Sequence, residues 1–431
     1  MASSEERVGK FLRRLLQQRS ALEIAQSLVG EERPIPPKVP GASSVSDLAI
    51  ERRWTLIHSS AETRQALLAP GSNAELQRYQ NNIENCIGTV KVPVGLAGPL
   101  RIRGMFASGD FYVPLATTEA ALVASYSRGA QVITEAGGCV SILLHEGMRR
   151  TPGFAFKTVK DAGLFAIWCI DQRQALSDAA ASTTHHGELI DLGIAIEGNH
   201  LYLILDYTTG DASGQNMVTI ATQAICEHIV SNAPITPEFF CVEANLAGDK
   251  KATAHSFVTV RGKKVTAEVK LPADLIKARL NTTPEQMEKY WRISSLGAVQ
   301  SGSIGMQGHF ANALTALYIA TGQDPACVAE SSVGITRFEL TEGGALYAAV
   351  TLPSIVVGTV GGGTALPTQR ACLEILGMAG EGKARGLAEL CGALALAGEI
   401  SIAAALCSRD FTRAHRKRAR GRNADPDGHR G

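Results

Sequence analysis

The sequence predicts a mixed α+β protein with more than one domain, and three observations support this. With 431 residues, 45% of them hydrophobic, the chain is long enough for two or three domains. Its 43 glycines and 5% aromatic residues are typical of an α/β enzyme with many tight turns. Within residues 153–233 the patterns run strand, helix, strand, strand, helix, which is typical of an α+β sandwich rather than a doubly wound sheet.

Charge and cysteine usage exclude several classes of protein. The chain carries 42 Lys and Arg against 41 Asp and Glu, so a general polyanion-binding surface is not expected. The nine cysteines are scattered and form no Cys-x-x-Cys pair, which favours a reducing compartment over a disulfide framework or a zinc site. We therefore expect a cytoplasmic protein without a metal.

No targeting or membrane segment is expected. The N-terminus is charged from Glu5 onward, unlike a signal peptide. The most apolar run, 390–406, is interrupted by Glu399 and predicts a packed helix rather than a membrane span. Near the start, the patterns predict an amphipathic helix over 8–29, a linker rich in Pro, Gly and Ser over 31–46, and a polar helical region over 46–80.

A helix is predicted over 120–134, after a proline, two threonines and a glutamate. Thr117 or Thr118 can cap this helix by accepting a hydrogen bond from a free backbone N–H. Glu119 then falls in the first turn, where the macrodipole favours a carboxylate. From this stretch alone, a charge-matched helix start explains Glu119 more simply than catalysis does.

The rest of the chain is predicted to alternate between strands and helices. Strands are expected at 154–159, 189–196, 201–207, 261–271 and 346–357, the last broken at Pro353. Helices are expected at 216–230, after Pro272, from about 367 and over 385–406. The Gly-x-Gly-x-x-Gly fingerprint of an ordinary Rossmann turn is absent, because glycines 361–363 are consecutive and the third position would be Leu366.

Four polar residues stand among small or apolar neighbours and would together suit the reduction of a carbonyl: Glu119, Lys250, Asp324 and His415. A cation stabilises the developing oxyanion, a carboxylic acid delivers a proton, and a histidine can protonate a leaving group near neutral pH. Asp324 follows a helix C-terminus, where the macrodipole disfavours an anion, so it needs a local partner such as a lysine. Taken singly, Lys250 is explained as a solvated charge and His415 as an inert residue of a basic tail.

Several stretches resemble the 3-hydroxy-3-methylglutaryl-coenzyme A (HMG-CoA) reductase family, in a match that covers residues 83–415. The run Gly-Thr-Val-Gly-Gly-Gly-Thr at 358–364 is nearly diagnostic. The other matching stretches are Glu84-Asn85-Cys86-Ile87-Gly88, Pro114 to Glu119 with Val123-Ala124-Ser125, Gly210-Asp211-Ala212 with Asn216-Met217, Asp249-Lys250-Lys251, Tyr318-Ile319-Ala320 with Gly322-Gln323-Asp324, and Pro353-Ser354-Ile355. The chain looks closer to the soluble catalytic portion of the eukaryote-like class than to the divergent bacterial class.

The resemblance implies a large α/β catalytic domain with a central helix, an inserted small α+β cofactor domain of ferredoxin-like type, and no ordinary Rossmann fold. The expected bounds are 1–80 for an N-terminal helical region, 81–152 with 240–406 for the large coenzyme A domain, 153–239 for the small NAD(P)-binding domain, and 407–431 for a mobile flap and tail.

The resemblance also implies a reaction, the four-electron reduction of (S)-HMG-CoA to (R)-mevalonate and coenzyme A by two NAD(P)H. The reaction passes through a hemithioacetal and an aldehyde. Lys250 would polarise the carbonyl, Glu119 would supply protons, and Asp324 would hydrogen-bond to both. His415 would protonate the departing thiolate, because a thiol has a pKa of about 8.5 and leaves better when protonated.

Binding residues follow from the same resemblance. Substrate and coenzyme A contacts would fall on Ser125, Arg128, Arg150, Asn245, Lys251, His309 and Asn312. Contacts to the expected cofactor, NADPH, would fall on Thr184, His185, Asp211, Ser213, Gln215, Asn216, Gly361, Gly362 and Gly363. Family members are dimers with sites at the subunit interface, so we expect a homodimer or a dimer of dimers. Neither nucleic acid nor a membrane is an expected partner.

Some residues depart from the family pattern. His185 stands where an arginine would pair with the 2′-phosphate of NADPH, and a histidine is mostly neutral at pH 7, which leaves NADH as an alternative cofactor. Ser127 replaces an asparagine, and residues 306–308 lack another. The alternatives are therefore a reductase of a related acyl-CoA or an enzyme that oxidises mevalonate. The basic tail offers a further alternative, a non-catalytic protein that binds nucleic acid through it.

Overall fold

The computed structural model describes residues 9–10, 13–14, 16–17, 20–29, 34–68, 76–80, 82–184 and 186–408. Their contacts divide the chain into two units, Met1–Thr89 and Val90–Gly431. The domain bounds expected from the sequence stay predictions. His185 and His415 lie outside the described residues.

Short helices form the first unit, and each is begun by a serine whose hydroxyl accepts a hydrogen bond from a backbone N–H of the first turn. These helices are α2 (Ala21–Ser27), α3 (Asp47–Trp54) and α4 (Ala61–Leu67), followed by the short 3₁₀ turn η1 (Gln77–Tyr79). Before α2, Ser20 is extended and forms a capping box with Glu23. The continuous helix predicted over 8–29 is therefore wrong, because Ser20 interrupts it.

A buried arginine organises the small core of the first unit. Arg53 is only 1% exposed, and its guanidinium donates hydrogen bonds to carbonyl oxygens of the surrounding loops. Apolar side chains surround it, namely Val45, Ile50, Trp54, Leu76 and Cys86. The arginine thus satisfies loop carbonyls that this small core would otherwise leave unpaired.

A sheet of ten strands forms the frame of the second unit, in the order β7-β4-β6-β3-β8-β10-β9. In addition, β1 pairs with β2 and β3, and β5 pairs with β6. Every pairing between these strands is antiparallel except that of β1 with β3. The strands are β1 (Val94–Gly104), β2 (Ser108–Ala116), β3 (Cys139–Arg150), β4 (Gly153–Ala155), β5 (Leu189–Glu197), β6 (His200–Tyr207), β7 (Phe239–Cys241), β8 (Gly262–Leu271), β9 (Ile335–Leu340) and β10 (Leu346–Ile355).

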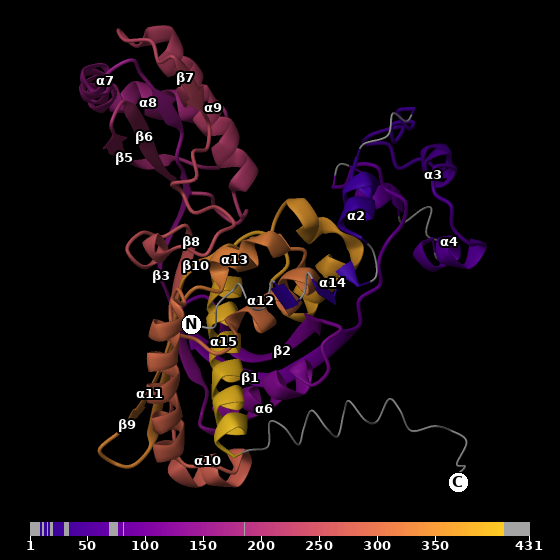
Figure 1. Cartoon of the computed structure of the whole chain (residues 1–431). Helices are drawn as coiled ribbons and strands as arrows, with labels where there is room; N and C mark the ends of the chain where they lie inside the picture. The colour runs from indigo at the N-terminus through magenta and orange to yellow at the C-terminus, as the bar shows by residue number, and fades with distance from the viewer. Residues whose placement is uncertain are drawn as a thin grey trace. The chain divides into compact units, whose positions relative to one another are not determined.

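Three helices accompany the strands β4 to β7 (Figure 1). They are α7 (Val159–Asp171), α8 (Arg173–Ala181) and α9 (Gln215–Asn232). The strand predicted over 154–159 is shorter than expected, because β4 ends at Ala155 and Thr158 caps α7 by accepting a hydrogen bond from the Asp161 N–H. The order strand, helix, strand, strand, helix is otherwise as predicted, except that two helices, α7 and α8, stand where one was expected.

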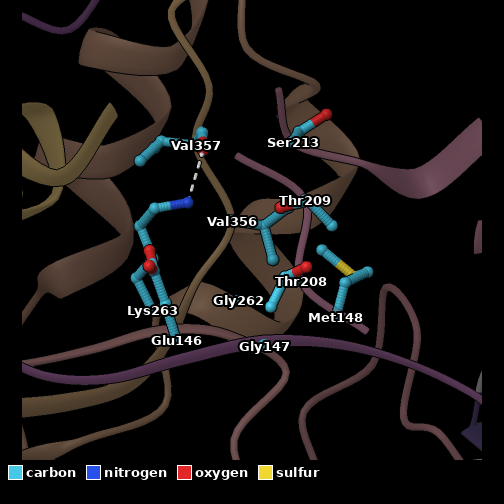
Figure 2. Close-up of a pocket in the computed structure, with 10 residues that line it drawn as sticks. All are labelled: Glu146, Gly147, Met148, Thr208, Thr209, Ser213, Gly262, Lys263, Val356 and Val357. Atoms are coloured by element: carbon cyan, nitrogen blue, oxygen red, sulfur yellow. Dashed lines mark hydrogen bonds between the residues drawn. The ribbon is translucent and has the colours of Figure 1, made fainter. Parts of the chain in front are cut away.

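The long strand β3 joins the two parts of the sheet. Its residues 140–147 pair with β8, and its last three residues pair with β6. Figure 2 shows the small cavity at this junction, where Lys263 donates a hydrogen bond to the Val357 carbonyl at 3.4 Å. Burial lowers the pKa of Lys263. The cavity measures about 10 Å³, which is room for roughly one water and not for a substrate.

One buried helix, α15 (Ala384–Cys407), lies at the centre of the second unit and packs on β1, β3, β8 and β10. Further helices surround these elements, namely α6 (Leu122–Glu135), α10 (Ala273–Leu280), α11 (Pro284–Ser301), α12 (Phe310–Thr321), α13 (Val328–Ser331) and α14 (Pro367–Ile375). In the described part of the chain, α15 alone is long and apolar enough to cross a membrane, but 83% of its most apolar stretch is buried in the protein. It is thus the core helix predicted from the sequence, and the predicted α+β class is confirmed.

Small residues let α15 approach its neighbours closely. A Cβ on Gly129 of α6 would lie 1.8 Å from the Ala397 carbonyl oxygen, so the two helix backbones touch. Two glutamates of α15 are buried and bind loops by their backbones. Glu389 accepts hydrogen bonds from the N–H groups of Phe106 and Ala107, and Glu399 from those of Gly308 and His309. Each carboxylate therefore satisfies donors that the loops cannot pair internally.

Candidate active site

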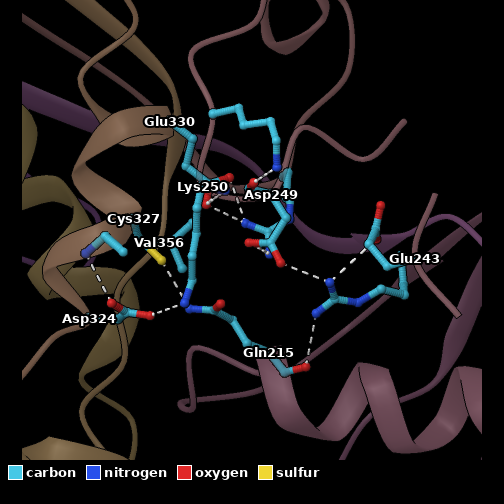
Figure 3. Close-up of polar contacts among 12 residues, drawn as sticks. Gln215, Glu243, Asp249, Lys250, Asp324, Cys327, Glu330 and Val356 are labelled. Atoms are coloured by element: carbon cyan, nitrogen blue, oxygen red, sulfur yellow. Dashed lines mark hydrogen bonds and ion pairs between the residues drawn. The ribbon is translucent and has the colours of Figure 1, made fainter. Parts of the chain in front are cut away.

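The structure brings two of the predicted catalytic residues together. Lys250 lies in the loop after β7, and Asp324 lies just after α12. The Lys250 Nζ is 2.7 Å from the Asp324 Oδ2 (Figure 3), with side chains 43% and 38% exposed. The local lysine partner that Asp324 was expected to need is therefore present. Both groups remain accessible to a ligand.

Each member of this pair keeps its partner ionised. The hydrogen bond that the Lys250 ammonium donates to Asp324 is the main cause that raises the pKa of Lys250. For Asp324, burial acts to raise the pKa, but the hydrogen bonds from Lys250 and from the Ala326 N–H outweigh it, and the pKa is lowered. The pair is therefore an ammonium group beside a carboxylate at neutral pH, which is a cation ready to meet a developing oxyanion.

The backbone at Lys250 is left-handed. Its φ of 54° is a conformation that non-glycine residues rarely adopt, at a cost of about 1 kcal/mol or more. A buried network surrounds it. Glu330 accepts a hydrogen bond from the Lys250 N–H at 3.2 Å and pairs with Arg261 at 2.5 and 2.6 Å. Asp249 lies between two arginines, 2.7 Å from Arg261 and 2.8 Å from Arg150.

Glu119 lies before a helix rather than in one, which corrects the sequence prediction. The helix α6 begins at Leu122, and Ala121 before it has a left-handed φ of 75° with no side-chain cap. Thr117 instead accepts a hydrogen bond from the Glu119 N–H at 3.0 Å, in a turn that precedes the helix. Glu119 is therefore outside the first helical turn and gains little from the macrodipole there.

Within one chain, Glu119 is not joined to Lys250 or Asp324. Its carboxylate accepts hydrogen bonds from the Asn312 side chain at 3.1 and 3.2 Å. Asn312 lies near the start of α12, whereas Asp324 follows its end, so about 14 Å of helix separates them. Glu119 and Asn312 border a cavity of about 320 Å³ that Lys250 does not line. The predicted hydrogen bond between Asp324 and Glu119 is therefore not formed within a single chain.

A second cavity, of about 520 Å³, combines the Lys250–Asp324 pair with most of the predicted cofactor residues. It is lined by residues 212–217, Lys250, 322–324, Gly358 and 360–364. Ser213, Gln215, Asn216 and the three glycines therefore lie around one space, and their contact with a cofactor there stays a prediction. A Cβ on Gly361 or Gly362 would meet no atom within 4 Å, so the glycine backbone is open to a ligand there.

Two predicted cofactor residues lie elsewhere. The Asp211 carboxylate accepts hydrogen bonds from the Gly382 and Ala384 N–H groups and so holds the start of α15. The Thr184 hydroxyl accepts one from the His186 N–H. Neither residue lines the 520 Å³ cavity. Their contacts to a cofactor stay predictions, as does that of His185, which lies outside the described residues.

The predicted substrate residues fall into separate groups. On α6, Ser125 and Arg128 both contact Ser401 of α15. His309 lies 3.4 Å from Glu399, and its ring nitrogen is 3.2 Å from the Tyr126 hydroxyl. Half-buried Asn312 contacts Glu119. Ser125 and Arg128 therefore lie on α6, and His309 and Asn312 lie at the start of α12, with α15 supplying partners for three of the four.

The other three predicted substrate residues lie in or beside the Lys250 loop. Asn245 and Lys251 are exposed, and the Lys251 Nζ donates to the Asp249 carbonyl at 3.1 Å. Arg150 is 5% exposed and donates to Asp249 and Glu243, so its guanidinium holds the loop rather than facing a cavity. A substrate contact of Arg150 stays a prediction that this geometry does not favour.

Sequence reasoning missed three charged residues that shape the site: Arg261, Glu330 and Glu399. Glu330 and Glu399 are each a single charge in an apolar or small-residue run, as in Val328-Ala329-Glu330-Ser331. An isolated charge in such a run predicts a buried, paired group, so a signal was available for these two glutamates. Arg261 is followed by Lys263 and Lys264 and carries no such signal. Among the described residues, no group of three or more His, Cys, Asp or Glu could hold a metal.

The sequence is similar to known proteins of one family. The family model described as hydroxymethylglutaryl-coenzyme A reductase matches residues 49–420. The chain is 44% identical over 342 residues to the 3-hydroxy-3-methylglutaryl-coenzyme A reductase of Pyrococcus abyssi, covering 78% of this chain and 84% of that protein. It is 42% identical over 381 residues to that of Haloferax volcanii, covering 87% and 93%. It is 40% identical over 348 residues to reductase 2 of Dictyostelium discoideum, covering 78% and 65%.

A solved structure shares the fold. The class II 3-hydroxy-3-methylglutaryl-CoA reductase from Streptococcus pneumoniae, described as bound to NADPH in open conformations, aligns with a TM-score of 0.63 at 20% identity. The alignment covers 81% of this chain and 97% of that one.

Proposed function

We propose a reductase function from one premise: the chain belongs to the hydroxymethylglutaryl-coenzyme A reductase family. The proposed reaction reduces (S)-HMG-CoA to (R)-mevalonate and free coenzyme A, with two NAD(P)H and two protons consumed. The observation that carries the proposal is the Lys250–Asp324 ion pair, 2.7 Å apart, on the wall of the cavity that the glycine run borders.

Lys250 is the proposed oxyanion-stabilising group. Its ammonium is held charged by Asp324, so it can polarise the thioester carbonyl and later the aldehyde carbonyl without itself losing a proton. The 43% exposure of its side chain leaves room for a carbonyl oxygen beside it. Asp324 is proposed to orient the ammonium and to balance its charge.

Glu119 is the proposed proton donor, supplied by the partner subunit of a dimer. Within one chain it is separated from Lys250 by the length of α12 and lies on a different cavity. A two-fold dimer can bring that cavity against the Lys250 loop of the second copy. Each site would then combine Lys250 and Asp324 of one protomer with Glu119 of the other.

The 520 Å³ cavity is the proposed site of the nicotinamide cofactor. Its open glycine backbone and the polar side chains of Ser213, Gln215 and Asn216 fit a phosphate-bearing ligand, because backbone and amide N–H groups can approach it closely. When bound, the cofactor supplies hydride to the carbonyl carbon. NADPH is the proposed choice, with NADH as the alternative that His185 leaves open. His415, beyond the described residues, is proposed to protonate the departing thiolate.

The proposed compartment is the cytoplasm. All nine cysteines lie within the described residues and are free, as in a reducing compartment. The apolar helix α15 is buried in the core of the second unit.

The test of this function is a turnover assay on the purified protein with HMG-CoA. Loss of reduced nicotinamide absorbance is followed with NADPH and NADH separately, while a thiol reagent measures released coenzyme A. Full reduction to the alcohol requires two cofactors oxidised per thiol released, whereas arrest at the aldehyde gives one. Absence of turnover with both cofactors would remove the proposed function.

A further inference from the structure

Lys250 has an unfavourable backbone conformation that its proposed catalytic role does not explain. Its φ of 54° is a conformation that favours glycine or asparagine. Glycine cannot replace it, because the reaction uses the ammonium group. Contacts outside the loop must therefore hold this residue in place.

Glu330 makes the contact that meets this need. Its carboxylate accepts a hydrogen bond from the Lys250 backbone N–H at 3.2 Å, and its side chain is buried at 3% exposure (Figure 3). Glu330 is not among the residues that line the 520 Å³ cavity. It therefore contacts the backbone of Lys250 without facing the space in which the substrate carbonyl would lie.

Arg261 fixes the Glu330 carboxylate in turn. Its guanidinium donates to both carboxylate oxygens, at 2.5 and 2.6 Å, and it also pairs with Asp249 at 2.7 Å. Arg261 is 3% exposed, so these interactions are shielded from water and strong. The residue before Lys250 and the Lys250 N–H are thus both tied to one arginine–glutamate pair.

A single short segment holds Lys250 at its two ends. Asp324 directly precedes the 3₁₀ turn η3 (Pro325–Cys327), and Glu330 lies in α13, which follows η3. Asp324 binds the Lys250 Nζ, and Glu330 binds its backbone N. The segment is itself anchored, because the Ser331 hydroxyl bonds to the Tyr318 hydroxyl and accepts from the Val356 N–H.

We propose that Glu330, with Arg261, is a positioning residue that holds Lys250 in its left-handed conformation, so that the ammonium group meets Asp324 and the substrate carbonyl. This inference rests on the proposed reductase function. The buried Glu330–Arg261 pair fixes the backbone of Lys250 and so the direction in which its side chain leaves the loop. Asp324 fixes the position of the ammonium group.

The test compares Glu330→Gln with a matched buried glutamate. Glutamine keeps one acceptor oxygen but turns an N–H₂ group toward Arg261, so the Lys250 N–H loses its anionic partner. We expect kcat to fall about tenfold, with KM for HMG-CoA and for the cofactor within about twofold. Glu389→Gln is the control, because Glu389 is fully buried and also accepts backbone N–H groups, but it lies on α15. It should lower Tm and leave kcat unchanged.

Two further measurements separate positioning from general damage. In hydrogen–deuterium exchange, the Lys250 amide should exchange about tenfold faster in Glu330→Gln and at the wild-type rate in Glu389→Gln. In an Asp324→Asn background, where the tip of the lysine is already released, Glu330→Gln should lower kcat by less than about twofold. If Glu330→Gln does not fold, the double change with Arg261→Gln, which leaves neither member of that pair charged, takes its place.

Each outcome decides the inference. Wild-type kcat in Glu330→Gln, or an equal loss of kcat in both Asp324 backgrounds, would overturn it. If the wild-type protein shows no turnover, the proposed function fails. Hydrogen–deuterium exchange of the Lys250 amide then still tests whether Glu330 holds Lys250 in place. Unchanged exchange of the Lys250 amide in Glu330→Gln would show that Glu330 does not hold the loop.

Discussion

At the scale of single residues, the ion pair of Lys250 and Asp324 sets what the site can do. The pKa of the lysine is raised and that of the aspartate is lowered. The contribution of the lysine to folding stability is therefore fully present below its usual pKa of about 10.4, and it is lost as pH rises through the folded-state pKa. That of the aspartate is present above about 3.9 and lost as pH falls through its folded-state value. The pair is thus fully ionised across the neutral range.

Lys250→Ala should lower kcat by on the order of 10²- to 10³-fold, because it removes the group aimed at the developing oxyanion. Tm should stay close to the wild-type value, because an ion pair this exposed contributes little to stability. Steady-state kinetics and a thermal melt measure both effects. Lys270→Ala, on the exposed face of β8, is the control and should match wild type. Wild-type kcat in Lys250→Ala would remove this lysine from the mechanism.

Cofactor choice is a second property of single residues. His185→Arg should shift preference toward NADPH by roughly tenfold or more, because a permanent charge can pair with the 2′-phosphate. The measurement is the ratio of kcat/KM for NADPH to that for NADH. His186→Arg serves as the neighbouring control. An unchanged ratio in His185→Arg would mean that the 2′-phosphate is recognised elsewhere.

The residue scale also shows how far sequence could reach. The need of Asp324 for a cationic partner could be predicted, because it depends only on the position of Asp324 after the C-terminus of a helix. The pairing of Glu330 with the Lys250 N–H did not follow, since the two residues are 80 positions apart. No short-range pattern encodes a contact of that separation.

At the scale of elements, α15 acts as a scaffold for the substrate side of the proposed site. Glu399 on this helix accepts hydrogen bonds from Gly308 and His309 N–H groups and from the Thr336 hydroxyl. Burial acts to raise its pKa, but the His309 side chain and the hydrogen bonds from the Gly308 and His309 N–H groups outweigh it, and the pKa is lowered. The helix therefore fixes the turn that begins α12, which bears His309 and Asn312.

Glu399→Gln should lower the free energy of unfolding by about 1–3 kcal/mol at pH 7, because it removes an anion from several donors. Since the folded-state pKa lies below the usual value of about 4.3, the difference between wild type and variant should be full above that pH and shrink as pH falls further. Urea unfolding at a series of pH values measures it. Glu374→Gln, in an exposed pair on α14, should stay within about 0.5 kcal/mol of wild type. A pH-independent difference would contradict this account.

Element boundaries were predicted less well than element identity. The helix α6 starts two residues later than expected, because the left-handed Ala121 delays it, and nothing in the residue type signals that conformation. The strand β10 continues through Pro353, because a register shift after Leu352 removes the proline from the ladder with β8. The long helices α9 and α15 were predicted within two residues at each end, since their patterns are long.

At the scale of the whole molecule, the separation of Glu119 from Lys250 makes a prediction about assembly. Subunits carrying Glu119→Gln are mixed with subunits carrying Lys250→Ala and allowed to re-equilibrate. Half of the resulting dimers are hybrids, and each hybrid holds one complete site if Glu119 acts across the interface. About a quarter of wild-type activity should therefore return.

The control mixture combines Lys250→Ala with Asp324→Asn. These two residues pair within one chain, so no hybrid contains a complete site and no activity should return. Recovery in the control would mean that Lys250 and Asp324 need not come from one chain. No recovery in the first mixture would mean that Glu119 does not complete the site of its partner.

The central place of α15 has a consequence for how the protein is made. This helix follows every other described element of the second unit in sequence, yet β1, β3, β8 and β10 all pack on it. A ribosome releases those strands first, and until α15 emerges the faces that pack on it stay uncovered. The second unit thus cannot complete its core until α15 has been synthesised. A ribosome stalled shortly before α15 would leave an open, aggregation-prone sheet rather than a smaller working enzyme.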